Sequence, residues 1–271
     1  MGKRVLVAVV CIPLIFVVFY FLPPIGLPIA ISLLSMIALH EVLWSTGFVK
    51  NLWISGLSIV LSGLVPFWIY IGGGMNSALA GIFVYFVVMF LIAISSHYTV
   101  TLEKMGGSFF FAVLIPYFLS SFVRLSNMEL GGFLILLPLV VSFASDAFAL
   151  FAGMAFGRHK LAPALSPKKT VEGALGGLTA AVVFCMLYGL ILEKGFQVEA
   201  NYLLLALYGL LGSLVAQLGD LSFSYIKRQY GLKDFGNIFP GHGGVLDRFD
   251  SVIFCAPLIE LLISYFPALG G

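Results

Sequence analysis

The chain alternates long apolar runs with short polar, glycine-rich or proline-rich connections. A membrane-spanning helix needs about 20 mostly apolar residues, and windows of that length predict nine spanning helices. The windows are 5–22, 25–43, 52–71, 78–95, 108–122, 131–156, 173–192, 202–221 and 251–266. Glycine and proline interrupt helices, so turns are expected at the paired breakers between windows. These are Pro23-Pro24, Gly72-Gly73-Gly74, Gly106-Gly107 and Gly131-Gly132.

Composition supports a membrane protein. Hydrophobic residues make up 61% of the 271 positions and the mean hydropathy is +1.11, whereas apolar residues make up about 45 to 50% of a soluble chain. The expected fold is therefore an all-α polytopic integral membrane protein embedded in a lipid bilayer. A net charge of +2 is too small to indicate nucleic acid as a partner.

The distribution of positive charge predicts the topology. With nine spans and a cytoplasmic N-terminus, every Lys and Arg except Arg124 and Lys194 falls on the cytoplasmic side, as the positive-inside rule requires. The C-terminus would then lie outside. The two long polar connections, 157–172 and 222–250, would share the cytoplasmic face. We divide the chain into N-terminal helices (1–75), middle helices (76–157) and C-terminal helices with the polar connections (158–271).

Three carboxylates near the last polar connection are candidates for a metal site. Asp247 and Asp250 are three residues apart, so a helix that includes both would place them on one face. Asp220 ends the eighth window at a similar depth. Carboxylate oxygens together with substrate phosphates are the usual ligands of Mg²⁺, and a second cation is compatible with three acids. The competing interpretation is that Asp247 and its neighbour Arg248 only pair with interfacial groups.

The same connection offers a site for an anion. Glycine permits a positive φ and leaves backbone N–H groups accessible, which makes the Gly243-Gly244 pair a candidate phosphate-binding turn. A structural hydrogen bond is an equally good reading of the adjacent His242, and Ser224 is either a site residue or a simple helix-end residue. Counter-charges for an anion come from Lys227, Arg228, Lys233 and Arg248.

The other polar connection contains a helix-start signal. Ser166 followed by Pro167 predicts a helix with Ser as the cap and Pro at its first position. That helix would open with Lys168, Lys169 and Thr170, where the two cations add charge to an anion site. Anchoring at the cytoplasmic surface is the alternative role for the two lysines.

Two isolated acids lie earlier in the chain. Asp146 stands alone inside the sixth window and is expected to face the same polar cavity, because a charge at bilayer depth is costly. Glu41 is expected to be an interfacial charge.

The last polar connection resembles, position for position, the signature of the phosphatidate cytidylyltransferases, also called CDP-diacylglycerol synthases. The matching residues are Ser224, Ile226, Lys227-Arg228, Lys233-Asp234, Gly236, Phe239-Pro240, His242-Gly243-Gly244-Val245 and Asp247-Arg248-Phe249-Asp250. The segment 166–173, with Asp146 upstream, is similar to a second polar block of that family. The resemblance covers about the C-terminal half of the chain.

The resemblance implies a Mg²⁺-dependent nucleotidyltransferase of phospholipid biosynthesis, with CTP and phosphatidic acid as substrates. Asp220, Asp247 and Asp250 would hold the metal. The expected catalytic residues are Lys227, Arg228, His242 and Arg248. The expected substrate-binding residues are Asp146, Lys168, Lys169, Thr170, Ser224, Lys233, Gly243 and Gly244. The implied location is the cell membrane, with the active site on the cytoplasmic side.

Two other functions also use aspartates in membrane helices. A CDP-alcohol phosphotransferase also joins lipids to nucleotides through aspartates, but it requires a pattern of acids that this chain lacks. An ion-coupled transporter would use Asp146, Asp220 and Asp247 near a broken helix, yet no inverted repeat is visible. Small-residue spacings are compatible with a homodimer.

Overall fold

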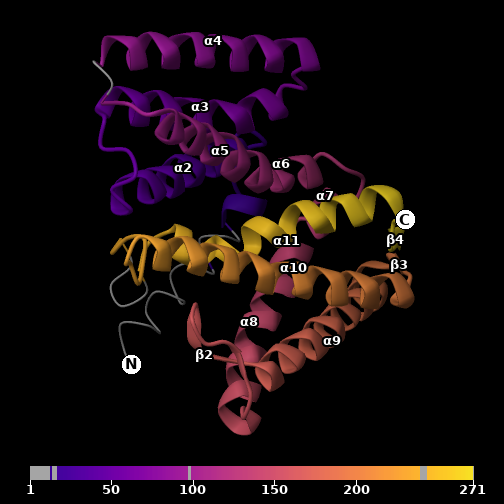
Figure 1. Ribbon diagram of the computed structural model, residues 1–271. Helices are drawn as coiled ribbons and strands as arrows, with labels where there is room; N and C mark the ends of the chain where they lie inside the picture. The colour runs from indigo at the N-terminus through magenta and orange to yellow at the C-terminus, as the bar shows by residue number, and fades with distance from the viewer. Residues whose placement is uncertain (1–12, 14–16, 97–98, 239–242, 271) are drawn as a thin grey trace. The chain divides into compact units, whose positions relative to one another are not determined.

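The computed structural model describes residue 13 and residues 17–96, 99–238 and 243–270 (Figure 1). The chain forms two compact units. Unit 1 contains residues 1–124 and 234–248, and unit 2 contains residues 125–233 and 249–271. Two helices carry residues of both units, namely α6 (Ser121–Ser126) and α11 (Leu246–Tyr265). The three sequence ranges proposed above stay a prediction.

Unit 1 is built from helices only in its described part. Its elements are α2 (Gly26–His40), a π-helical turn (Glu41–Ser45), α3 (Leu52–Tyr70), α4 (Met75–Ser95) and α5 (Leu102–Leu119). A side-chain cap explains where α3 begins, because it satisfies backbone N–H groups that have no partner within the helix. Asn51 accepts hydrogen bonds from the N–H groups of Trp53 and Ile54 at the start of α3.

Unit 2 consists of long helices with two short antiparallel strand pairs. Its elements are α7 (Gly131–Leu134), α8 (Leu137–Phe156), β1 (Lys160–Ala162), β2 (Ser166–Thr170), α9 (Val171–Phe196), β3 (Glu199–Ala200), α10 (Tyr202–Gln229), α11 from Phe249 onward, and β4 (Leu269–Gly270). Strand β1 pairs with β2, and β3 pairs with β4. Helix α9 ends where Gln197 takes a left-handed conformation, with φ of 57°.

Seven helices among the described residues are long and apolar enough to cross a membrane, which confirms an all-α polytopic membrane protein. They are Gly26–Ser45, Leu52–Tyr70, Met75–Ser95, Leu102–Ser126, Gly131–Phe156, Val171–Phe196 and Tyr202–Gln229. These seven correspond to the second through eighth predicted windows. The first window, 5–22, lies largely outside the described residues. The ninth forms part of α11, a helix of 20 residues that is not among the seven.

Hydroxyl groups connect the apolar helices of unit 1. The Ser32 hydroxyl on α2 donates a 2.7 Å hydrogen bond to the Gly63 carbonyl on α3.

Gly106-Gly107, expected to form a turn, instead lies inside α5. The Phe48 ring occupies the space that a side chain at Gly107 would fill, so this glycine serves close packing rather than a chain reversal.

Small residues bring the helices of unit 2 close together. The Gly173 Cα lies against α8, where a Cβ on residue 173 would be 2.6 Å from the Ala149 carbonyl oxygen and 3.2 Å from the Gly153 Cα. Such close approach is typical of small-residue spacings in membrane helices. One turn before Ala149 on α8, the hydroxyls of Ser145 and Ser213 are 2.7 Å apart and connect α8 to α10.

The predicted helix start at Ser166-Pro167 is wrong. Residues Ser166–Thr170 form β2, and α9 begins at Val171. Thr170 is the actual N-cap, and its hydroxyl accepts a 3.1 Å hydrogen bond from the Gly173 N–H. Ser166 and Thr170 each offer a hydroxyl oxygen that could cap a helix. Because residues 166–170 pair with β1 as a strand, the helix begins only after them and Thr170 is the cap. Lys168 and Lys169 therefore lie on a strand that leads into the helix.

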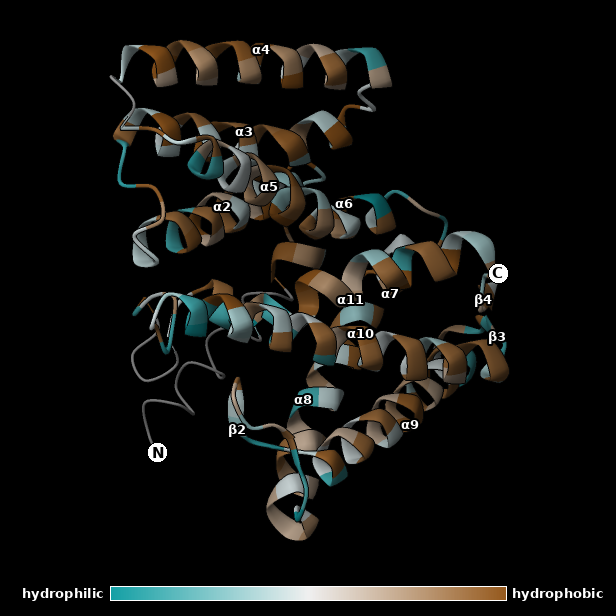
Figure 2. Ribbon diagram, in the orientation of Figure 1, coloured by the Kyte–Doolittle hydropathy of each residue, from teal (hydrophilic) through white to brown (hydrophobic). Residues whose placement is uncertain are grey.

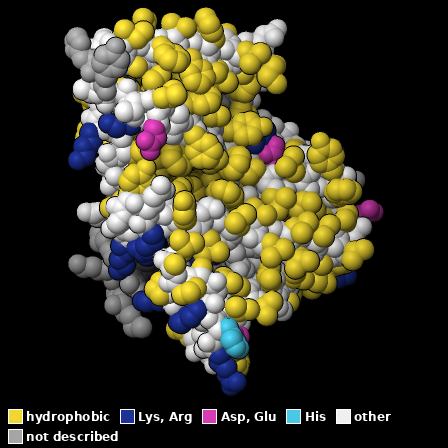
Figure 3. All heavy atoms as spheres, in the orientation of Figure 1, with side chains coloured by type: hydrophobic (Ala, Val, Ile, Leu, Met, Phe, Trp, Pro, Cys, Tyr) yellow, Lys and Arg dark blue, Asp and Glu magenta, His cyan; other side chains and the backbone are white. Residues whose placement is uncertain are grey.

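Hydrophobic side chains dominate the exterior of both units. Figure 2 shows α4 as almost entirely apolar, and only Tyr85 and Met89 of its 21 residues are buried. Figure 3 shows yellow apolar side chains over most of the visible face, whereas blue cationic side chains gather beside the β2 hairpin of unit 2. This distribution is typical of helices that face lipid and of polar connections that face water.

Candidate functional site

A polar stripe follows one face of α10 into the middle of unit 2. Its members recur at alternating spacings of four and three residues, which places them on one side of a helix. They are Ser213, Gln217, Asp220, Ser224 and Lys227. The Gln217 amide donates to the Ala174 carbonyl on α9 at 3.1 Å. The stripe therefore carries polar groups along one face of a mostly apolar helix.

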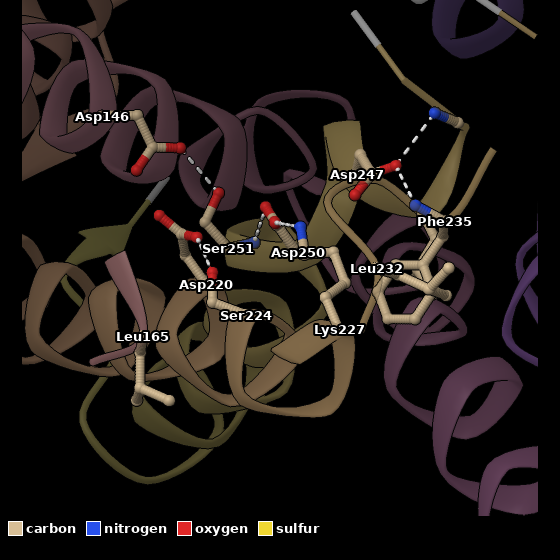
Figure 4. A network of polar contacts seen from close by, with 12 residues as sticks. Asp146, Leu165, Asp220, Ser224, Lys227, Leu232, Phe235, Asp247, Asp250 and Ser251 are labelled. Atoms are coloured by element: carbon tan, nitrogen blue, oxygen red, sulfur yellow. Dashed lines mark hydrogen bonds and ion pairs between the residues drawn. The ribbon is translucent and has the colours of Figure 1, made fainter. Parts of the chain in front are cut away.

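Three carboxylates in unit 2 come from three different helices (Figure 4). Asp146 lies on α8, Asp220 on α10 and Asp250 on α11. The Ser251 hydroxyl donates a 2.7 Å hydrogen bond to Asp146 Oδ2, and the Ser251 N–H donates a 2.9 Å bond to Asp250 Oδ1. The charges of Asp146 and Asp220 both act electrostatically on Asp250. We call these three residues the acid cluster.

Two lysines form ion pairs with acids of the acid cluster. Lys169 from β2 forms an ion pair with Asp220 in which each side chain is 26% exposed. Lys227 Nζ lies 3.9 Å from Asp250 Oδ2, with side-chain exposures of only 9% and 12%. The Asp250 pair is therefore the more deeply buried of the two. The site thus sets carboxylates, which attract cations, beside ammonium groups, which attract anions.

The fourth predicted acid, Asp247, has a different environment in unit 1. Its Oδ2 atom accepts hydrogen bonds from the Phe235 N–H at 2.7 Å and the Gly244 N–H at 2.9 Å (Figure 4). These bonds fasten the connection before α11 to the first turn of that helix. Asp247 and Asp250 both lie on α11, as expected from their spacing, but their side chains make different contacts.

Glu41, expected to be an interfacial charge, is buried within unit 1. Its side chain is 3% exposed, and its two oxygens accept hydrogen bonds from the N–H groups of Val245 at 2.9 Å and Leu246 at 2.8 Å. Its depth in the membrane stays a prediction, but sequence spacing gives no sign that a residue at the end of α2 meets a helix start 204 and 205 residues later.

The glycine pair behaves in part as predicted. Gly243 has a φ of +83°, a conformation that favours glycine. The N–H groups expected to hold an anion hold carboxylates of the chain itself, because Gly244 donates to Asp247 and Val245 to Glu41. His242 lies outside the described residues. The role of the pair in binding substrate stays a prediction.

The remaining predicted residues differ in their surroundings. The Arg228 guanidinium donates to two backbone carbonyls, of Leu165 at 3.1 Å and Leu232 at 2.7 Å, so it joins the β1–β2 hairpin to the end of α10. Ser224 is buried and donates a 3.4 Å bond to Asp220. Thr170 is the buried cap of α9. The side chains of Lys168, Lys233 and Arg248 are exposed.

The acid cluster has the type of ligand atom that a hard divalent cation prefers. The cluster offers oxygen atoms only, which are the ligands that Mg²⁺ prefers. Among the described residues, no three His, Cys, Asp or Glu side chains form a group that could hold a metal ion. The lysines and Ser251 engage the carboxylates instead.

Sequence reasoning missed Ser251, Gln217 and Glu41. The alternating spacing on α10 is a signal that could have identified Gln217, because polar residues recurring at a helical period inside an apolar span must face a polar interior. Ser251 directly follows a predicted acid and could have been included on that basis. Glu41 has no comparable local signal.

Polytopic apolar helices and a cluster of acids and lysines, of which Asp250 and Lys227 are buried, define a membrane protein with a polar site in unit 2. The chain belongs to the cytidylyltransferase family, whose model matches residues 2–266. This confirms the family and the enzyme class predicted from the signature.

Three similar proteins are each named phosphatidate cytidylyltransferase. The protein from Bacillus subtilis is 34% identical over 98% of both chains. The protein from Rickettsia bellii is 38% identical over 65% of this chain and 78% of its own length. The protein from Staphylococcus epidermidis is 41% identical over 48% of each chain. The first of these alignments includes the N-terminal helices, which the signature alone does not cover.

Proposed function

We propose that this chain transfers CMP from CTP to phosphatidic acid and so produces CDP-diacylglycerol and pyrophosphate. The observation that carries the proposal is the family match over residues 2–266, together with a relative named for this activity that aligns over 98% of both chains. In the reaction, a phosphate oxygen of the lipid forms a bond to the α-phosphorus of CTP. The bond from that phosphorus to the bridging oxygen breaks, and pyrophosphate leaves with the electron pair.

The acid cluster and its lysines supply the positioning that this chemistry needs. Phosphoryl-type transfer depends mainly on alignment and on stabilising charge that develops on oxygen atoms. Lys169 and Lys227 place two cations beside the carboxylates of unit 2, where they can bind phosphate oxygens. The lipid phosphate is already anionic at neutral pH, so no general base is required.

We propose that Asp220 and Asp250, with Asp146 nearby, hold Mg²⁺. When bound, the ion would neutralise charge on the triphosphate. Support comes from the oxygen-only donor set and from the electrostatic influence of Asp146 and Asp220 on Asp250. Asp247 as a further ligand, and a second cation, stay predictions.

The proposed location of the site is the cytoplasmic leaflet, with nine spans and a cytoplasmic N-terminus. The length of helix α9 supports a site near one membrane surface. Lys169 lies two residues before the first residue of α9, and Lys194 lies in its last turn. At 1.5 Å per residue, 23 residues separate Val171 from Lys194 by about 35 Å, roughly a membrane thickness. A homodimer also stays a prediction.

The proposal is tested with purified protein, labelled CTP and phosphatidic acid in detergent. We expect pyrophosphate release that needs both substrates and a divalent cation, and loss of that release when the cation is chelated. Asp250→Asn should abolish turnover in a folded protein. Glu199→Gln is the matched control, because Glu199 is an exposed acid on β3. Absence of CDP-diacylglycerol in the unmodified protein would refute the proposed function.

A further inference from the structure

We infer that Glu41 is a positioning residue for the reaction: it fastens the N-terminal end of α11 and thereby sets the placement of the aspartates on that helix. The inference rests on the proposed function, because its catalytic readout is CMP transfer. It assigns a role to the N-terminal helices, whose amino-acid sequence carries no part of the signature.

The contacts of Glu41 are those of a helix cap supplied from a distant segment. The first N–H groups of a helix have no partner within it, and negative charge is favourable at that end. Glu41 accepts hydrogen bonds from the Val245 and Leu246 N–H groups at 2.9 and 2.8 Å. Asp247 accepts a bond from the preceding Gly244 N–H. Two carboxylates therefore bind three consecutive N–H groups and fix the start of α11.

Two glycines make room for the Glu41 carboxylate. A Cβ on Gly236 would lie 2.5 Å from Glu41 Oε1 and 2.9 Å from its carboxyl carbon. A Cβ on Gly244 would overlap the same carboxylate. Both glycines belong to the signature, so part of the signature is shaped around a residue outside it. A buried carboxylate enclosed in this way is held in one orientation.

The backbone at Glu41 is also distinctive. The residue begins a π-helical turn, Glu41–Ser45, that follows α2 directly. Such turns are rare and occur frequently at functional sites. An extra residue in the turn changes the direction of the side chains that follow α2, and Glu41 and Leu43 within it are fully buried. The π turn is thus a second, independent feature at the position of the cap.

The consequence for the active site follows from the continuity of α11. Asp247 and Asp250 are the second and fifth residues of this helix, so a shift or fraying of its first turn moves their backbone. A misplacement of about 1 Å can reduce the rate of an enzyme by 10²-fold. Loss of the Glu41 contacts should therefore lower kcat without removing any group that touches substrate.

The experiment uses Glu41→Gln in the full-length protein. The amide keeps one acceptor oxygen but sets its NH₂ group against a backbone N–H, so one of the two hydrogen bonds is lost. We expect kcat per folded enzyme to fall 10- to 100-fold with less than a threefold change in KM for CTP. Amide exchange in peptides covering residues 243–250 should become faster. Glu103→Gln is the matched control, because Glu103 is an exposed acid in the first turn of α5.

A double-mutant cycle tests whether the glycine and the glutamate act through one contact. Gly236→Ala should displace the Glu41 carboxylate, which lies 2.5 Å from the position of the added Cβ, and should lower kcat at least tenfold. In a Glu41→Ala background the carboxylate is absent, and the same change should alter kcat less than threefold. Independent effects of the two substitutions would overturn the inference.

The outcomes separate the inference from the proposed function. Unchanged exchange in residues 243–250 of Glu41→Gln, or faster exchange with wild-type kcat, would overturn the positioning role. A lower yield of folded protein with normal kcat per folded molecule would also overturn it, since that is the effect of a merely structural residue. Unmodified protein that makes no CDP-diacylglycerol would refute the proposed function, and exchange alone would then decide whether Glu41 anchors α11.

Discussion

The buried pair of Lys227 and Asp250 gives the sharpest test of the site. Lys227→Met keeps the length and the apolar stem of the side chain but removes the charge 3.9 Å from Asp250 Oδ2. Because the Asp250 side chain is only 12% exposed, solvent cannot replace the lost cation. The remaining neighbours of Asp250 include two acids, Asp146 and Asp220, which repel it.

The expected cost follows from the distance. Two unit charges 3.9 Å apart interact by about 4 kcal/mol at an effective dielectric constant of about 20. Removal of one partner of a buried pair typically costs about 3 to 5 kcal/mol, which agrees. A Lys227→Met/Asp250→Asn double variant has neither charge and should recover much of that loss. Both variants should be inactive, because each lacks a group of the proposed site.

The measurement is unfolding in detergent followed by circular dichroism, which reports on the helices of both units and so includes those of unit 2. Tryptophan fluorescence is unsuitable, since Trp44, Trp53 and Trp68 all lie in unit 1. Independent substitutions add to within about 0.3 to 0.5 kcal/mol. If the two single losses simply add in the double variant, Lys227 and Asp250 do not form an energetic pair and the argument is refuted.

Three further predictions concern other parts of the molecule. Lys194→Ala should leave activity within twofold of the unmodified protein, because Lys194 is 74% exposed at the opposite end of α9; a large loss would contradict the proposed depth of the site. Lys169→Gln should lower kcat at least tenfold but change the free energy of unfolding by less than about 1 kcal/mol, since its pair with Asp220 is partly exposed; a large destabilisation with normal kcat would reverse that assignment. Gly243→Ala should destabilise the protein by about 1 to 2 kcal/mol, the cost of placing an L-residue in the left-handed region, and an unchanged unfolding temperature would exclude strain at φ +83°.

Apolar runs predicted the helices well because length and hydropathy alone decide whether a segment can span a bilayer. Seven of the nine windows match helices of that kind. The errors arose where tertiary contacts override local signals. Gly106-Gly107 looks like a turn but accommodates the Phe48 ring within α5. Ser166-Pro167 looks like a cap but pairs as a strand, and Thr170 takes the capping role.

The site was predictable to the extent that its residues follow one another in sequence. The signature gave Asp250 and Lys227, and the structure brings them together from α11 and α10. Asp146 was expected to face a polar cavity, which stays a prediction; the structure shows that it is exposed and accepts a hydrogen bond from Ser251 on α11. Partners such as Lys169 for Asp220 could not be assigned, because pairing between helices depends on packing that a single sequence does not contain.

The contrast between Asp247 and Asp250 shows why a motif does not reveal the role of each member. Both acids stand on one face of the first turns of α11, and counted over the whole residue each is less than 10% exposed. Asp247 binds two backbone N–H groups, so its charge is stabilised by the loop that it holds in place. Asp250 is bound by a lysine at 3.9 Å and repelled by two acids, so its charge is the one that a cation would stabilise most. Asp247, which holds the backbone, and Asp250, which is repelled by other acids, thus belong to one motif. Only the groups around each carboxylate distinguish their roles.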